Sequence, residues 1–181
     1  KLELWDVKGN IACTEKNIII TEPVTAEIIS PHGSYMTADT IAIDVASQPA
    51  DTEITITIDG TPYTNNSTIQ GYKVGLGQHI LEVKVGDKIL DQETFSIDTS
   101  YGDTIKLISQ LYTTGKIKNL GLAVSLICKL KLAETFASFN MVRMEKKFLD
   151  NVIDELNKAG EKKIGINYRT ILFVNIFVLG V

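Results

Sequence analysis

The residues best suited to acid–base or metal chemistry in this 181-residue chain are two histidines, His32 and His79. His32 lies in a Pro-His-Gly turn, and His79 opens a run of alternating apolar residues. A catalytic or metal-binding histidine needs carboxylates or thiols close by, and the spacing along the chain offers no such cluster. We therefore expect both histidines to be structural and the chain not to be an enzyme.

Other patterns that could support catalysis or cofactor binding are incomplete. No serine lies in a nucleophile-elbow context, including Ser34, Ser67 and Ser125. The glycine-rich run from Gly71 to Gly77 neither follows the right kind of strand nor opens a helix, so it is predicted to be a loop and not a phosphate-binding motif. We predict no catalytic, cofactor-binding or metal-binding residues.

The two cysteines, Cys13 and Cys128, fall in different predicted domains and form no disulfide framework. Both are expected to be free thiols that are mostly buried, with Cys128 filling an apolar position of a helix.

We expect no cofactor, and a bound calcium ion is the alternative that the sequence leaves open. Four carboxylates, those of Asp39, Asp44, Asp51 and Asp59, lie at loop ends or on outward positions, although the spacing of an EF-hand is absent. Two overlapping glycosylation sequons, at Asn65 and Asn66, indicate an exposed loop.

The first half of the chain has the pattern of a β-sandwich. Short runs rich in Thr, Ile and Val alternate in polarity and are separated by turn residues. Strands are expected at residues 26–30, 40–47, 52–59, 79–85 and 93–98. The inward residues would be Ile28, Ile41, Ile43, Val45, Ile54, Ile56, Ile58, Leu81, Val83, Phe95 and Ile97.

Helical periodicity dominates residues 101–164, with Gly115, Asn140 and Gly160 at the breaks. Ser100 and Asn119 are candidate helix caps, as is Asn167 for a last helix. The tail, residues 170–181, is almost wholly apolar but too short to span a bilayer, which needs about 20 residues. It is expected to complete the bundle, to pack on a partner, or to be a truncated membrane anchor.

The amino-acid sequence of the helical half resembles that of the FIMAH domain, a helical module of secreted and surface-bound microbial proteins. The most specific pieces are Gly115–Asn119, Ser125–Leu130 and Gly160–Ile164, although a histidine often found near Phe148 in that family is absent. No chemistry is established for the family. The run from Gly77 to Val85 similarly resembles a strand of bacterial Ig-like repeats.

Residues 1–21 look like the end of an upstream Ig-like copy. A strand at 2–4, a turn at 8–10 and a strand at 17–20 parallel the end of the sandwich. This segment is expected to fold back as extra strands, to be the remnant of a cut repeat, or to add to the sheet of a neighbouring molecule and build a fibre. The chain begins with Lys1 and shows no signal peptide, as expected of a mature product or a fragment.

Charge divides the chain into two halves. Residues 1–98 carry 6 Lys and Arg against 15 Asp and Glu, a net of −9, whereas residues 99–181 carry 12 against 7, a net of +5. The charge difference between the halves has two possible explanations. It serves ordinary solubility, or the basic half contacts an anionic polymer. The candidate contacts are Lys129, Lys131, Lys146, Lys147, Lys162 and Lys163.

The sequence therefore predicts an α+β chain of two separate domains, an Ig-like sandwich at 22–98 and a bundle of three or four helices at 99–181. The expected function is a non-catalytic spacer, anchoring or adhesion module of a secreted or cell-surface protein. Two alternatives are a carbohydrate-binding accessory of a secreted polysaccharide-degrading enzyme or protease, and a fibre subunit. Partners would be extracellular or cell-wall polysaccharide, neighbouring protein domains or other copies of the chain, without nucleic acid or a membrane span.

Overall fold

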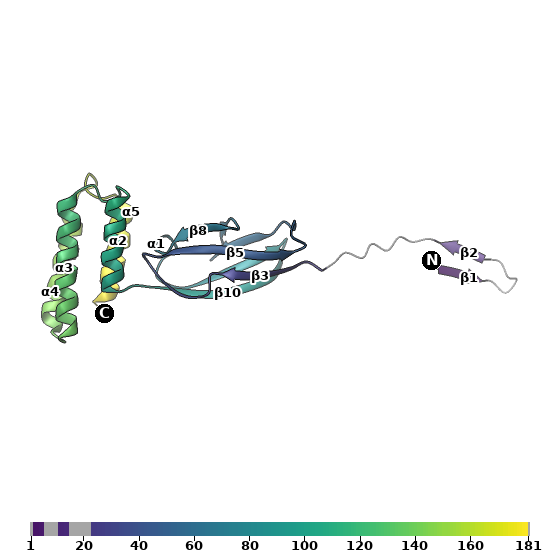
Figure 1. The fold of residues 1–181 in the computed structure, drawn as a ribbon, viewed down its shortest axis with the longest axis horizontal. Coiled ribbons are helices and arrows are strands. Elements are labelled where there is room, and N and C mark those ends of the chain that lie inside the picture. The colour runs from purple at the N-terminus through teal and green to yellow at the C-terminus, as the bar shows by residue number, and fades with distance from the viewer. Residues whose placement is uncertain (1, 6–10, 15–22, 181) are drawn as a thin grey trace.

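The computed structural model describes residues 2–5, 11–14 and 23–180, and it confirms the predicted fold class. A two-layer β-sandwich is followed by a bundle of four helices (Figure 1). In the first layer, β5 (Thr40–Gln48) lies between β3 (Thr25–Ser30) and β8 (Ser67–Gln70). The second layer has the order β4 (Gly33–Met36), β10 (Lys88–Asp98), β9 (Gly77–Val85), β6 (Thr55–Ile58) and β7 (Thr61–Tyr63).

Alternation along the strands fills the space between the two layers. All of the predicted inward residues are buried except Ile54, which is half-buried against the same core. Ile69 of β8 is also buried there, because the short strand that carries it pairs with β5. Within the sandwich, three strands were not predicted, namely β4, β7 and β8, and each has four residues or fewer.

The helical half contains α2 (Tyr101–Thr113), α3 (Leu120–Ser138), α4 (Val142–Lys158) and α5 (Ile166–Leu179). The side chains of Ser100 and Asn119 cap α2 and α3, as predicted, by accepting from backbone N–H groups. The prediction of Asn167 as the last cap is wrong, because Gly165 holds that position and Asn167 lies inside α5.

One face of α5 completes the bundle. Leu172, Asn175 and Ile176 are buried, whereas Phe173 and Phe177 on the other side are exposed. The tail is therefore both a core helix and an apolar surface. No helix in the described part of the chain is long and apolar enough to cross a membrane.

At the start of the chain, β1 (Leu2–Trp5) pairs with β2 (Ile11–Thr14) in a two-stranded antiparallel sheet of their own. In the described chain Ile11 lies opposite Trp5, so β2 is a strand that the sequence did not predict. The predicted strand at 17–20 lies outside the described residues. The described strands β1 and β2 extend neither layer of the sandwich, so the expected fold-back as extra strands is not seen for them.

Candidate functional site: the domain junction and the ends of the bundle

His79 lies in the sandwich core and is held by two oxygen atoms. Its Nδ1 is 2.6 Å from Oδ2 of Asp59, and its Nε2 is 3.2 Å from the carbonyl of Gly75. A carboxylate and a carbonyl both accept hydrogen bonds, and each ring nitrogen faces one of them. The ring also packs against Phe95 and is only 7% exposed. Both ring nitrogens are thus engaged by oxygen atoms of the sandwich.

Asp59 fixes the turn after β6. Burial acts to raise the pKa of this carboxyl, but the hydrogen bonds from His79 and from the N–H of Ile80, together with the charge of His79, hold that pKa below its usual value. His32, by contrast, is exposed and lies 3.3 Å from Glu93. The fold thus brings one carboxylate to each histidine, which spacing along the chain did not reveal. Neither pair belongs to a cluster of three potential metal ligands in the described residues.

The carboxylates considered for calcium do not gather. Asp39 is paired with Lys106 and Asp59 with His79, while Asp51 is exposed in a turn. Among residues 2–5, 11–14 and 23–180, no group of three or more His, Cys, Asp or Glu side chains is placed to hold a metal ion. Two of the serines considered bond to other side chains: Ser34 to Ser96, and Ser125 to Glu155.

The most extensive polar site joins the two domains. Thr37 and Ala38, in the loop between β4 and β5, meet Asp103 in the first turn of α2. The carboxylate of Asp103 accepts from the Thr37 hydroxyl and, at 3.0 Å, from the N–H of Ala38. Asn175 of α5 places its side-chain oxygen 2.9 Å from the same hydroxyl. Thr37, Asp103 and Asn175 are all buried, so this network is sheltered from water.

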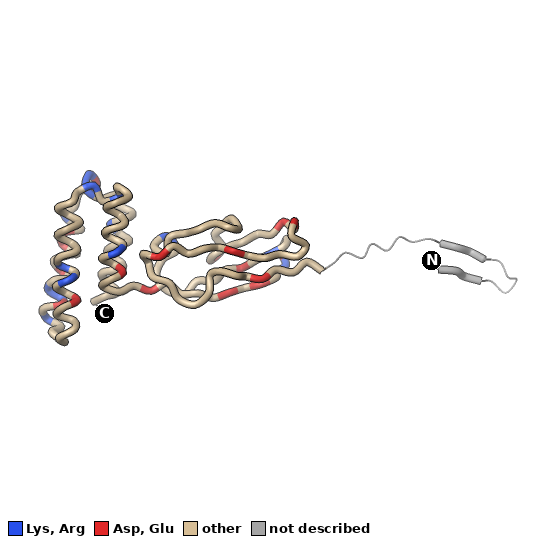
Figure 2. Tube along the Cα trace, in the orientation of Figure 1, with Lys and Arg blue, Asp and Glu red and all other residues tan. Residues whose placement is uncertain are grey.

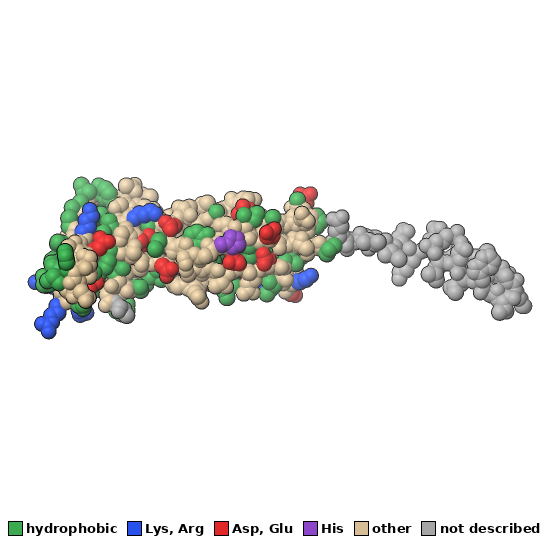
Figure 3. Space-filling view, turned by 60° about the horizontal axis from the view of Figure 1, so that its bottom comes forward, with side chains coloured by type: hydrophobic (Ala, Val, Ile, Leu, Met, Phe, Trp, Pro, Cys, Tyr) green, Lys and Arg blue, Asp and Glu red, His purple; other side chains and the backbone are tan. Residues whose placement is uncertain are grey.

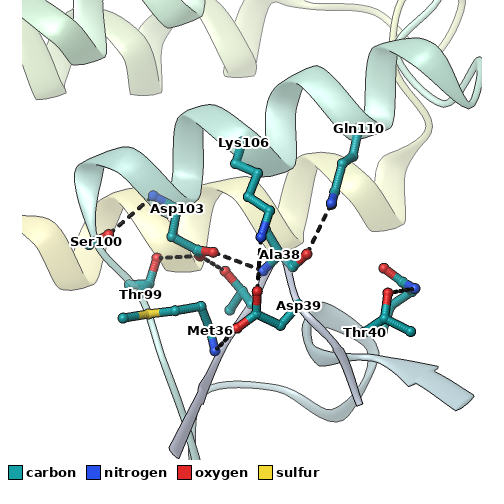
Figure 4. Close-up of polar contacts among 11 residues, drawn as sticks. Met36, Ala38, Asp39, Thr40, Thr99, Ser100, Asp103, Lys106 and Gln110 are labelled. Atoms are coloured by element: carbon teal, nitrogen blue, oxygen red, sulfur yellow. Dashed lines mark hydrogen bonds and ion pairs between the residues drawn. The ribbon is translucent and has the colours of Figure 1, made fainter. Parts of the chain in front are cut away.

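A second set of contacts lies at the edge of this network, as Figure 4 shows. Lys106 of α2 donates to Asp39 at 2.9 Å, and Gln110 donates to the carbonyl of Ala38 at 3.0 Å. The hydrogen bond from Lys106, and after it the N–H of Met36, holds the pKa of Asp39 below its usual value. Side chains from three successive turns of α2 thus form hydrogen bonds with the loop between β4 and β5.

The glycine-rich run that follows β8 closes the junction from the other side. Its first four residues form the short helix α1 (Gly71–Val74), so the prediction of a loop is wrong there. The N–H of Tyr72 donates to the carbonyl of Thr37 at 2.8 Å, which holds this helix against the β4–β5 loop. A small cleft of about 140 Å³ remains beside it, lined by Tyr72, Leu76, Ile171 and Val174 among others. It is largely apolar and too small for a drug-sized ligand, for which pockets usually measure about 300–1,000 Å³.

One end of the bundle is strongly basic. The α2–α3 and α4–α5 loops lie side by side there, because the N–H of Lys118 donates to the carbonyl of Lys163 at 2.8 Å and Ile117 bridges to Ile164. We name this end the lysine tip; it consists of Lys116, Lys118, Lys158, Lys162 and Lys163, all exposed (Figure 2, top of the bundle). In the part of the chain that the structure describes, none of the five forms an ion pair with a carboxylate.

Local structure explains why these cations stay together. Ile117, Ile164 and Ala159 are buried beneath them, so the two loops are anchored to the bundle core. Lys116 lies 5.6 Å from the ring centre of Tyr168, a cation–π arrangement. A polar hollow of about 230 Å³ opens at the start of α3, between Lys158 and Lys163, with Glu155 on its wall. Glu161 is the acidic residue within the α4–α5 loop.

The six lysines predicted from the sequence are not brought to one place. Lys162 and Lys163 belong to the lysine tip, whereas Lys146 and Lys147 lie in the first turns of α4, at the other end of the bundle. Lys131 is exposed along α3, and Lys129 is paired with Glu155. The missed members, Lys116, Lys118 and Lys158, are visible in the sequence as cations near the breaks at Gly115 and Gly160, but only the pairing of the two loops joins them.

The two sequons differ in accessibility. The amide of Asn65 donates to the carbonyl of Val45 and accepts from its N–H, at 2.8 and 2.9 Å, so this side chain is tied to β5. Asn66 is exposed and has φ 55°. Only Asn66 presents its side chain for modification without loss of a sandwich contact.

Cys128 does not occupy the buried position that was predicted for it. The thiol is free and exposed on α3. The mistake follows from the composition of this helix, whose exposed residues include Leu120, Val124 and Leu132 as well. An apolar neighbourhood in the sequence does not identify the buried face when a helix is apolar all round. The side chain of Cys13 lies outside the described residues.

Comparisons of the sequence with protein-family models and with curated proteins, and of the fold with solved structures, found no match. The resemblances to the FIMAH domain and to Ig-like repeats stay predictions.

Proposed function

We propose that this chain is a non-catalytic module of a secreted or cell-surface protein that anchors to an acidic polysaccharide. In this proposal the lysine tip makes the contact, and the sandwich serves as a spacer that carries it. The observation that carries the proposal is the pairing of the α2–α3 and α4–α5 loops, which gathers five exposed lysines free of carboxylate partners within the described chain.

The charge distribution supports this function. The helical half carries a net charge of +5 and the remainder −9, by the counts given above. An anionic polymer would be attracted to the bundle and repelled by the sandwich, which orients the module on its ligand. Lysines on a surface bind repeated anionic groups through point charges, and such binding tolerates variation in the sugar sequence.

The spacer role is supported by the junction. A buried carboxylate that accepts from Thr37 and Ala38, together with the outer pair Asp39–Lys106, fixes α2 against the end of the sandwich. Domains joined only by a flexible linker would reorient freely, whereas this contact holds the bundle in one direction.

The test is electrophoresis of the folded chain through native gels that contain polygalacturonate, with neutral dextran as the comparison polymer. The chain should be retarded by polygalacturonate and not by dextran. The double substitution K118S/K163S should remove most of the retardation, because it takes two charges from the centre of the lysine tip. The matched control is Lys88→Ser on the sandwich, which should be retarded like the unmodified chain. Equal retardation of all three proteins would overturn the proposal.

A further inference from the structure

The end of the bundle opposite the lysine tip presents apolar side chains to solvent. The turn between α3 and α4 contains Phe139 and Met141, and Val142 is the first residue of α4; their exposed fractions are 71%, 46% and 62%. Phe139 is the most exposed large apolar residue of the described chain. We call these three residues the apolar tip.

The turn that carries the apolar tip is well ordered by its own hydrogen bonds. The N–H of Met141 donates to the carbonyl of Phe136 at 2.8 Å, and that of Asn140 to Ala137 at 2.9 Å. With Asn140 at φ 57°, this is the Schellman ending of a helix. Phe136 and Phe148 stack beneath the turn, with ring centres 5.4 Å apart. The exposed side chains are thus held outward by a fixed backbone.

Cations lie directly behind the apolar tip. Arg143, Lys146 and Lys147 follow it in the first turns of α4, and all three are exposed. The nearby carboxylates are partly engaged: Glu145 accepts from the hydroxyl of Tyr101 at 2.6 Å, and Asp150 lies 3.9 Å from Lys146. Glu134 of α3 is exposed on the same end of the bundle. Figure 3 shows hydrophobic side chains beside Lys and Arg side chains on the bundle.

We propose that the apolar tip inserts into the interface of an anionic lipid bilayer. Three protruding apolar residues on a convex turn can enter the boundary between headgroups and acyl chains, where cations placed one or two turns behind them meet the anionic headgroups. A protein partner would need a pocket shaped to this projection. This contact is separate from the lysine tip, which lies at the other end of α3 and α4.

The experiment is flotation of the folded chain with vesicles of phosphatidylglycerol and phosphatidylcholine, and with vesicles of phosphatidylcholine alone. Binding should occur on the first and be much weaker on the second. Phe139→Ser should weaken binding about tenfold, because the largest inserted side chain is lost. Lys147→Ser should weaken it about fivefold, as expected for one cation near an anionic surface.

Matched controls distinguish insertion of the apolar tip from non-specific hydrophobic adsorption and from binding through the lysine tip. Leu120→Ser removes an apolar side chain that is 56% exposed at the start of α3, and it should leave vesicle binding unchanged. K118S/K163S lowers the general attraction to an anionic surface, so it should weaken binding less than Phe139→Ser does. Insertion itself is read from a Phe139→Trp variant in a Trp5→Phe background, whose fluorescence should shift to the blue and be quenched by brominated lipid.

Three results would overturn the proposal. One is the absence of binding to the anionic vesicles. Another is binding that Phe139→Ser and Leu120→Ser weaken equally. The last is concentration-dependent self-association of the chain, in sedimentation, that Phe139→Ser abolishes while vesicle binding is absent, because the apolar tip would then dock on a protein surface.

Discussion

The hydroxyl of Thr37, in the β4–β5 loop of the sandwich, is hydrogen-bonded to the carboxylate of Asp103, in the first turn of the bundle. The same hydroxyl lies 2.9 Å from the side-chain oxygen of Asn175. Both neighbours are acceptors, and a threonine hydroxyl has one proton, so one of the two contacts lacks a donor when Asp103 is ionised. The junction therefore holds a buried polar group whose hydrogen bonding is incomplete.

Because of this arrangement, two substitutions of Asp103 should lower the free energy of unfolding by different amounts. Asp103→Ala should lower the free energy of unfolding by about 2–3 kcal/mol, because the Thr37 hydroxyl and the Ala38 N–H lose a buried acceptor. Asp103→Asn should cost only about 1 kcal/mol, since its amide can donate to Thr37, which then donates to Asn175. Denaturant unfolding of the three proteins measures the difference, and equal losses for Ala and Asn would contradict the hydrogen-bond assignment.

Gly71 is required by close approach of two backbone segments. A Cβ at this position would lie 2.5 Å from the carbonyl oxygen of Met36, a backbone atom that cannot move aside cheaply. Gly71→Ala should therefore destabilise the chain by about 2 kcal/mol or more. Gly102→Ala is the control, because its nearest atom is the Ser100 Oγ at 4.0 Å and alanine favours the helix. Thermal unfolding should shift in opposite directions for the two variants.

Acid should weaken the chain through Asp39 and Asp59. Both carboxyls have a lowered pKa in the folded protein, so the unfolded chain binds protons first as the pH falls. The stability they provide is complete above the unfolded pKa, about 4, and is lost as the pH falls through the folded values. The free energy of unfolding of Asp39→Asn should thus depend less on pH below about 4 than that of the unmodified chain.

Exposure of Cys128 is testable by labelling. In a Cys13→Ser background the folded chain should react with a maleimide at a rate close to that of the unfolded chain, because the thiol on α3 meets solvent. A reaction that requires denaturant would show that the residue is buried after all.

Elements with strong periodicity could be predicted from the sequence. The inward residues of the sandwich follow a period of two, and the caps at Ser100 and Asn119 follow from a side-chain oxygen placed before a helical pattern. The short strands β4, β7 and β8 lacked such a pattern, because a strand of three or four residues shows at most two inward positions. Asn167 is not the cap because Gly165, a residue without a side-chain acceptor, occupies the N-cap position of α5.

The sites depended on contacts between distant segments. The junction joins Thr37 to residues 66 and 138 positions away, and nothing local to Thr37 indicates those partners. The lysine tip depends on the pairing of two loops 45 residues apart, from Lys118 to Lys163. Charge counting located the basic half correctly but could not sort its lysines, because helix phase and loop pairing decide which cations share a surface.

The most direct test of the proposed anchoring function is the salt dependence of polygalacturonate binding, measured by calorimetry on the unmodified chain and on K118S/K163S. Screening shortens from about 10 Å at 0.1 M salt to about 3 Å at 1 M, so binding through exposed lysines should weaken steeply over this range. The double variant should bind more weakly at low salt and show a shallower dependence. Binding that is unaffected by salt, or a variant with the same slope as the unmodified chain, would contradict the assignment of the lysine tip as the polymer contact.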